Sequence, residues 1–82
     1  MHLEPARTVI EKSGGVDAVS KITGRSVSRV YRWMYSRERG GTGGAVPHGE
    51  ARTLLDHAVA TGGALTAADF FLTSASAPEA AA

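Results

Sequence analysis

Five arginines lie between positions 25 and 39, and they give this 82-residue sequence its most distinctive chemistry. They are Arg25, Arg29, Arg32, Arg37 and Arg39. A guanidinium presents its N–H donors in a planar fork that matches phosphate oxygens and the edge of guanine. Residues 18–49 carry a net charge of +5, although the whole chain carries +1, and the stretches 1–17 and 50–82 carry −1 and −3. This distribution predicts a basic face that binds polyanions, with a solvated basic helix surface as the alternative.

Other reactive side chains are absent or are not spaced for chemistry. The sequence has no cysteine, which excludes disulfides, thiolate zinc sites and cysteine nucleophiles. His2, His48 and His57 do not have the spacing of metal ligands, and no serine is placed for a histidine–carboxylate pair. We therefore expect no catalytic residue, no metal and no cofactor, and the protein is not predicted to be an enzyme.

The length of 82 residues fits one small domain. The sequence lacks the apolar run of about 18–20 residues that a membrane span needs, and its first residues do not have the hydrophobic region of a signal peptide. We therefore expect a soluble, cytoplasmic protein without membrane contact.

Glycines and prolines divide the chain into short segments with the periodicity of helices. We expect a first helix over residues 5–13 and a second over residues 16–23, because the glycines at 14, 15 and 24 stop them. Ser26 is the predicted N-cap of a third helix, which extends to about residue 35. Residues 36–45 contain four glycines and are not expected to hold a helix.

A fourth helix is expected to open at Pro47 and to end at the glycines 62 and 63. Its predicted apolar face consists of Ala51, Leu54, Leu55, Ala58 and Val59. Glu50 and Asp56 are expected on its solvent face. Thr66 is the predicted N-cap of a short fifth helix, in which Asp69 completes a capping box and Phe70 packs against Leu65.

The expected fold class is therefore all-α, a compact domain of four to five helices. We assign residues 1-73 to this domain and residues 74-82, SASAPEAAA, to a disordered C-terminal tail because the tail consists mostly of small residues.

Residues 15–35, GVDAVSKITGRSVSRVYRWMY, resemble the helix-turn-helix of the Cro/CI-type phage-repressor family of DNA-binding regulators. Gly24 matches the turn glycine. Counted from it, the buried and small positions of the motif are occupied by Val19, Val30, Trp33 and Ser20. The residues that flank the glycine are usually apolar in the family, whereas here they are Thr23 and Arg25, so either Arg25 points outward or the turn has a different shape. The resemblance implies a lambda-repressor-like fold over roughly residues 5–72.

The resemblance also implies that the third helix, about residues 26-35, enters the major groove of DNA. The base-reading residues would then be Ser26, Val27, Ser28, Tyr31, Arg32 and Tyr35. Arg32 is suited to a bidentate contact with guanine, and Val27 either touches a thymine methyl group or packs into the core. The expected phosphate contacts are Arg25, Arg29, Arg37, Arg39, Gly41 and Thr42. The glycine-rich loop is either an anion-binding backbone nest or a flexible connector.

The sequence as a whole predicts a sequence-specific regulator of transcription that binds double-stranded DNA. By resemblance it is a nucleoid-associated repressor of phage or phage-like genes and binds an inverted repeat as a homodimer. Leu54, Leu55, Phe70 and Phe71 are candidates for the dimer interface or for the core. Two alternatives remain open: the antitoxin of a toxin–antitoxin pair, and a protein-binding adaptor that keeps the helix-turn-helix fold.

Overall fold

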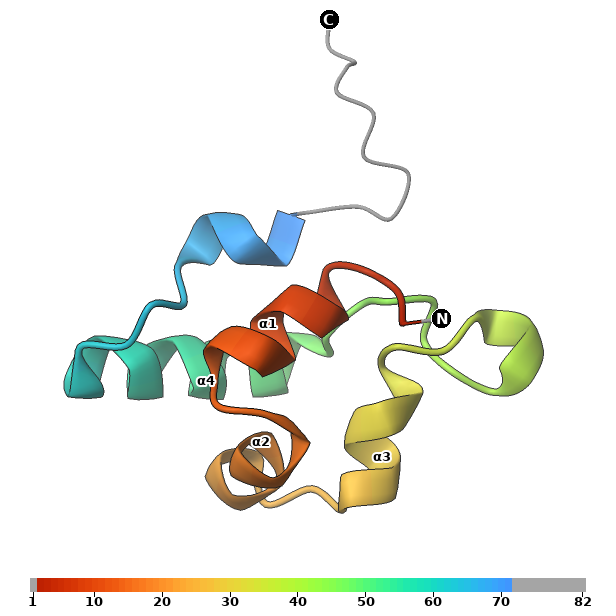
Figure 1. Cartoon of the computed structure of the whole chain (residues 1–82), viewed down its shortest axis with the longest axis horizontal. Helices are drawn as coiled ribbons and strands as arrows, with labels where there is room; N and C mark the ends of the chain where they lie inside the picture. Colours follow the sequence, from red (N-terminus) through yellow and green to blue (C-terminus); the bar gives the residue numbers. More distant parts are fainter. Residues whose placement is uncertain (1, 72–82) are drawn as a thin grey trace, which may run out of the picture.

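The computed structural model describes residues 2–71, and every regular element in this range is helical (Figure 1). The elements are α1 (Ala6–Lys12), α2 (Val16–Thr23), α3 (Val27–Arg32), the 3₁₀ turn η1 (Arg37–Arg39), α4 (His48–Thr61) and the 3₁₀ turn η2 (Ala67–Phe71). The all-α prediction is confirmed over these residues. The predicted tail, residues 74–82, lies outside the described residues.

A three-residue turn joins α2 to α3. Gly24 ends α2 in the left-handed conformation, with φ of 75°, which a side chain would strain. Ser26 caps α3 as expected, because its Oγ accepts a hydrogen bond of 3.2 Å from the N–H of Arg29. The hydroxyl of Thr23 donates to the Val19 carbonyl at 2.8 Å and accepts from the N–H of Arg25 at 3.3 Å. The polar residues beside Gly24 thus have structural roles in the turn.

The core forms where α2 packs against α1, α3 and α4. Figure 1 shows α4 running behind α1, with α2 and α3 below them. The largest fully buried side chains are Trp33, Leu54, Val9, Val19 and Val30. Trp33 therefore lies in the core, as its spacing from Val30 predicts. This packing fixes α3 from its inner side and leaves its other side exposed.

α3 is shorter than predicted, since it ends at Arg32 rather than near Tyr35. The glycine-rich loop folds back onto this end of the helix. The carbonyl of Arg32 accepts from the N–H of Thr42 at 3.0 Å, and the carbonyl of Tyr35 accepts from the N–H of Gly43 at 2.8 Å. Carbonyl groups that a longer helix would pair with its own next turn are thus satisfied by the loop.

The loop itself is more ordered than its composition suggests. It contains the single turn η1, which the sequence did not predict, and Gly40 ends that turn with φ of 84°. A Cβ atom at position 41 would overlap the backbone oxygens of Arg32 and Tyr35. Only glycine lets the loop approach α3 this closely.

The predicted face of α4 is correct at Leu54 and Ala58, which are buried. Val59 was expected on the same face, but 76% of it is exposed. The reason is tertiary: Gly62 ends α4 in the left-handed conformation, and the following chain carries η2 to α1. Among the described residues nothing covers the end of α4 at Val59.

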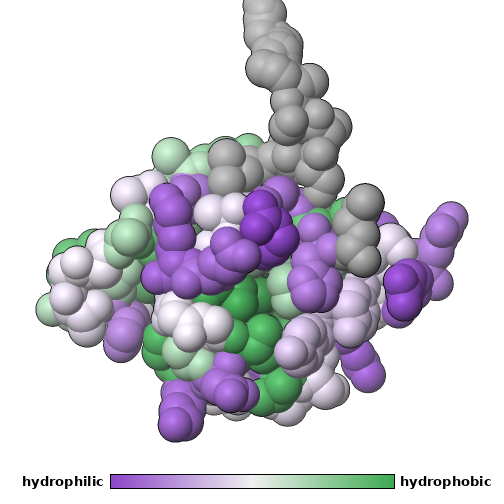
Figure 2. Space-filling model, viewed as in Figure 1, coloured by the Kyte–Doolittle hydropathy of each residue, from purple (hydrophilic) through white to green (hydrophobic). Residues whose placement is uncertain are grey.

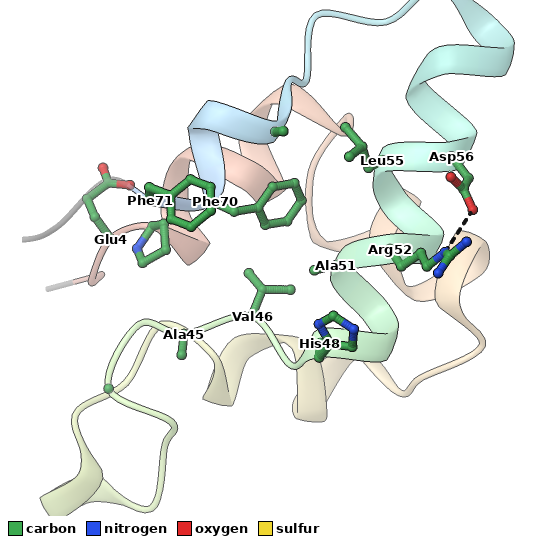
Figure 3. Close-up of a pocket in the computed structure, with 13 residues that line it drawn as sticks. Glu4, Ala45, Val46, His48, Ala51, Arg52, Leu55, Asp56, Phe70 and Phe71 are labelled. Carbon is green, nitrogen blue, oxygen red and sulfur yellow. Dashed lines mark ion pairs between the residues drawn. The ribbon is translucent and has the colours of Figure 1, made fainter.

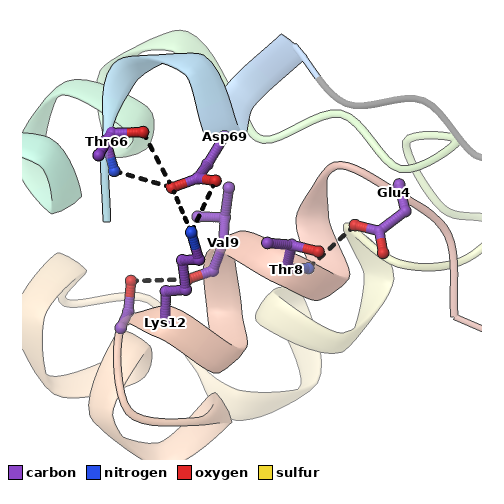
Figure 4. Close-up of polar contacts among 7 residues, drawn as sticks. Glu4, Thr8, Val9, Lys12, Thr66 and Asp69 are labelled. Atoms are coloured by element: carbon purple, nitrogen blue, oxygen red, sulfur yellow. Dashed lines mark hydrogen bonds and ion pairs between the residues drawn. The ribbon is translucent and has the colours of Figure 1, made fainter. Parts of the chain in front are cut away.

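The fifth element is a 3₁₀ turn rather than an α-helix, and Asp69 fastens it to α1 (Figure 4). The Asp69 carboxylate accepts from the N–H of Thr66 at 2.8 Å, which is one half of the predicted capping box. The Thr66 hydroxyl donates to the same carboxylate instead of capping a backbone amide. The Lys12 ammonium donates to both Asp69 oxygens, at 3.0 and 3.2 Å. The hydrogen bond from the Thr66 N–H, together with the Lys12 contact, lowers the pKa of Asp69.

Candidate nucleic-acid interface

The exposed side of α3 carries most of the residues expected to read bases. Because Val30 lies in the core, the helical repeat places Ser28, Tyr31 and Arg32 on the outer side, and all three are exposed. Val27 is 39% exposed at the edge of this side, so its alternative assignment to the core is wrong. In Figure 2 hydrophobic side chains reach the surface over α2 and α3 among hydrophilic ones. Such a surface offers both polar and methyl contacts.

Two of the expected base-reading residues have other roles. The Oγ of Ser26 is used as the N-cap of α3. Tyr35 follows the end of the helix and is half-buried, so it does not continue the outer side of α3. Its ring instead contacts the guanidinium of Arg39, whose Cζ lies 5.6 Å from the ring centroid. Tyr35 therefore belongs with the loop arginines.

An N-terminal arm lies beside α3, which the sequence did not reveal. The His2 and Tyr31 ring centroids are 6.4 Å apart. The N–H of Leu3 donates to the Met34 carbonyl at 2.9 Å and so fastens the arm to the end of α3. These contacts join residues about thirty positions apart, and no local pattern in the first five residues predicts them.

The four arginines expected at phosphates, Arg25, Arg29, Arg37 and Arg39, are all exposed, as is Arg32, which was expected to read bases. Arg25 differs, because its Nε donates to the carboxylate of Glu50 in a close ion pair. Glu50 was expected on the solvent face of α4, but only 13% of its side chain is exposed. The Arg25 hydrogen bond lowers the pKa of Glu50 against the opposing effect of burial, and the charge of Arg29 adds to the lowering.

The glycine-rich loop uses its backbone amides internally. The N–H of Gly41 donates to the Ser36 carbonyl at 2.9 Å, and the N–H of Thr42 donates to α3 as described above. The Thr42 hydroxyl donates to the carbonyls of Trp33 and Ala45, at 3.1 and 2.6 Å. Because these N–H groups are already paired with carbonyls of the protein, they do not form an anion-binding nest. Gly41 and Thr42 hold the loop on α3, and we leave both out of the interface.

A hollow of about 270 Å³ lies where α3, the loop and the start of α4 meet. Arg29, Arg32 and Glu50 contribute its charged side chains. Glu50 therefore stands among three arginines of the α2–α3 region, because it also contacts Arg25. One carboxylate thus reduces the positive charge at the N-terminal side of the exposed face.

A second surface is mainly apolar (Figure 3). It is a groove of about 810 Å³ between α4, η2 and residues 43–48, and neither α2 nor α3 contributes to it. Val46, Leu55, Phe70 and Phe71 line it, and Phe71 is 80% exposed. Of the four residues proposed for the dimer interface or the core, Leu54 is in the core and the others reach this groove.

The helices formed by residues 2–71 are too short or too polar to span a bilayer. In the same range, His, Asp and Glu side chains do not gather in groups of three that could bind a metal ion. Comparisons with protein-family models, curated proteins and solved structures found no match for this chain. The interpretation of function therefore depends on the residues and geometry described above.

Proposed function

We propose that this protein is a sequence-specific regulator of transcription that binds double-stranded DNA with α3 in the major groove. The observation that carries the proposal is the division of α3 into two sides. Val30 fixes one side in the core, and Ser28, Tyr31 and Arg32 lie exposed on the other. A rigidly held helix with polar and cationic side chains on its free side suits the reading of base edges.

The arrangement of α2 and α3 supports this proposal. A three-residue turn with a left-handed Gly24 joins them, and α2 packs on both α3 and α4. In a helix-turn-helix the second helix reads the groove and the first crosses the backbone. We assign these roles to α3 and α2.

The exposed side chains divide into two groups by the chemistry they offer to DNA. Arg32 is suited to a bidentate contact with guanine, and Val27 to a thymine methyl group. Arg29, Arg37 and Arg39 are assigned to phosphates, which set affinity and orientation without reading sequence.

We further propose that the protein acts as a homodimer on an inverted repeat and represses the genes beside it. The α3 helix has six residues and is about 9 Å long, so one copy reads only a few base pairs. The apolar groove supports pairing, since it lies on a surface to which α3 does not contribute. Two copies joined there would keep both reading helices exposed.

The decisive experiment is selection of duplexes from a random library on the purified protein at moderate salt. Arg32→Ala is the test variant, and Arg7→Ala, which changes an exposed arginine on α1, is the control. We expect wild type and Arg7→Ala to enrich the same inverted repeat, and Arg32→Ala to enrich it with one base position of each half-site relaxed. Retention without a motif would mean binding through phosphates alone. No retention would favour the adaptor hypothesis, with the apolar groove as the site of a protein partner.

A further inference from the structure

Glu50 connects two parts of the chain that the sequence keeps 25 residues apart. It is the third residue of α4. Its carboxylate accepts a hydrogen bond from the Nε–H of Arg25, which lies in the turn between α2 and α3. Its side chain is 13% exposed, whereas that of Arg25 is 48% exposed. The pair therefore lies at the edge of the proposed DNA-binding surface, with the carboxylate on the inner side.

The position of Glu50 has a simple structural role that must be separated from any role in binding. A carboxylate in the first turn of a helix is stabilised by the helix dipole and by backbone N–H groups. That role would require no arginine. The hydrogen bond from Arg25 is nevertheless the largest cause of the lowered pKa of Glu50, and the charge of Arg29 adds to the lowering. Glu50 also lines the hollow that Arg29 and Arg32 share.

An arginine at the position of Arg25 would ordinarily increase binding to every DNA sequence. It precedes the N-cap of α3, where a helix that enters the major groove comes close to the sugar–phosphate backbone. Each arginine that neutralises a phosphate strengthens binding to specific and unrelated DNA alike. Occupying such an arginine within the protein therefore lowers the affinity for every duplex and the salt dependence of binding, and it leaves the ratio of specific to unrelated affinity unchanged.

We propose that Glu50 limits the sequence-independent part of DNA affinity, because it holds Arg25 in an internal ion pair and so keeps it from a phosphate contact. Its role is to position Arg25, and the reading itself is left to Arg32 and its neighbours on α3. This inference rests on the proposed function, since it needs DNA as the ligand.

The test compares Glu50→Gln with wild type on the selected duplex and on an unrelated duplex over a series of salt concentrations. We expect Glu50→Gln to bind both duplexes several-fold more tightly, by about the same factor. Its log–log salt dependence should steepen by about 0.9, the value for one additional phosphate contact. Arg25→Ala should keep the wild-type slope, and the double variant should return to it. Glu50→Asp keeps the carboxylate and should restore the wild-type slope.

Glu11→Gln is the matched control, because Glu11 also pairs with an arginine, Arg7, at 3.0 Å, but on α1. It should change the slope by much less than Glu50→Gln does. An equal change in both would show an effect of net charge alone and overturn the inference. A lower slope in Arg25→Ala would also overturn it, because Arg25 would then already contact phosphate. Absence of DNA binding by wild type would instead remove the proposed function, and this inference with it.

Discussion

Arg32 and Arg39 carry the same charge in different surroundings. Arg32 is the last residue of α3 and is exposed on its outer side. Arg39 lies in η1, with its guanidinium 5.6 Å from the centre of the Tyr35 ring. A contact with guanine needs the guanidinium fork in one orientation, whereas a contact with phosphate needs mainly the charge. The two arginines should therefore respond differently to the same substitution.

We expect Arg32→Ala to lose discrimination at one base position, by about 1–3 kcal/mol. Arg39→Ala should weaken binding to all duplexes about equally and lower the log–log salt slope by about 1. Replacement by lysine should preserve most of the binding at position 39 but not the discrimination at position 32. Titrations against duplexes with single base changes measure both effects. Matching profiles for the two alanine variants would refute this division of roles.

At the scale of elements, the loop of residues 36–45 acts as the C-terminal cap of α3. Its backbone supplies the N–H groups that satisfy the carbonyls of Arg32 and Tyr35. The closest approach occurs at Gly41, where a Cβ atom would overlap those two oxygens. The loop therefore sets where α3 ends and where the η1 arginines lie relative to it.

Gly41→Ala should lower the free energy of unfolding by about 1–3 kcal/mol, because the methyl group forces the loop away from α3. Gly49→Ala is the control, since that glycine lies within α4 and a Cβ atom there meets no neighbour within 4 Å. It should raise the free energy of unfolding by about 0.5–1 kcal/mol, through the lower entropy of the unfolded chain. Urea unfolding of wild type and both variants measures these changes in the free energy of unfolding. A loss of stability at position 49 as large as at 41 would contradict this prediction.

At the scale of the whole molecule, the ion pair of Lys12 with Asp69 joins elements 57 residues apart. It holds η2 against α1, and η2 carries Phe70 to the edge of the core. The pKa of Asp69 is lowered on folding, so its contribution to stability is complete above the unfolded-state pKa of about 3.9 and is lost as the pH falls through the folded value.

Asp69→Asn should therefore destabilise the protein at neutral pH, by about 1–3 kcal/mol for the hydrogen bonds that it weakens. The difference from wild type should shrink as the pH falls from about 4 through the lowered folded pKa, because the carboxylate is protonated first in the unfolded chain and then in the folded protein. Thermal unfolding at several pH values measures this. Asp56→Asn changes an exposed carboxylate on α4 and should shift stability by no more than about 0.5 kcal/mol. A difference between Asp69→Asn and wild type that persists at low pH would contradict the assignment.

The proposed homodimer is also a property of the whole molecule. Phe71 and Val59 are similarly exposed, at 80% and 76%, but only Phe71 lines the apolar groove. We expect sedimentation to show a concentration-dependent dimer that Phe71→Ser weakens and Val59→Ser does not. A monomer at concentrations that saturate the selected duplex would refute the dimer. An unchanged dimer in Phe71→Ser would place its interface elsewhere.

The sequence by itself determined the class of the fold and most of the helix boundaries. The signals are local, because Gly24, Ser26, Pro47 and Gly62 act on the backbone within a few residues of themselves. The helical repeat around Val30 likewise predicted which side of α3 faces outward. Of the expected base-reading residues, Val27, Ser28, Tyr31 and Arg32 are exposed there.

Only the tertiary structure decided the features that need contacts between distant residues. The contact with the loop determines that α3 ends at Arg32. The packing of η2 against α1 means that Val59 is not covered. Glu50 also pairs with Arg25, one of the arginines expected at phosphates. Periodicity reports which side of a helix is apolar, but it carries no information on which segment covers that side or which charge lies opposite.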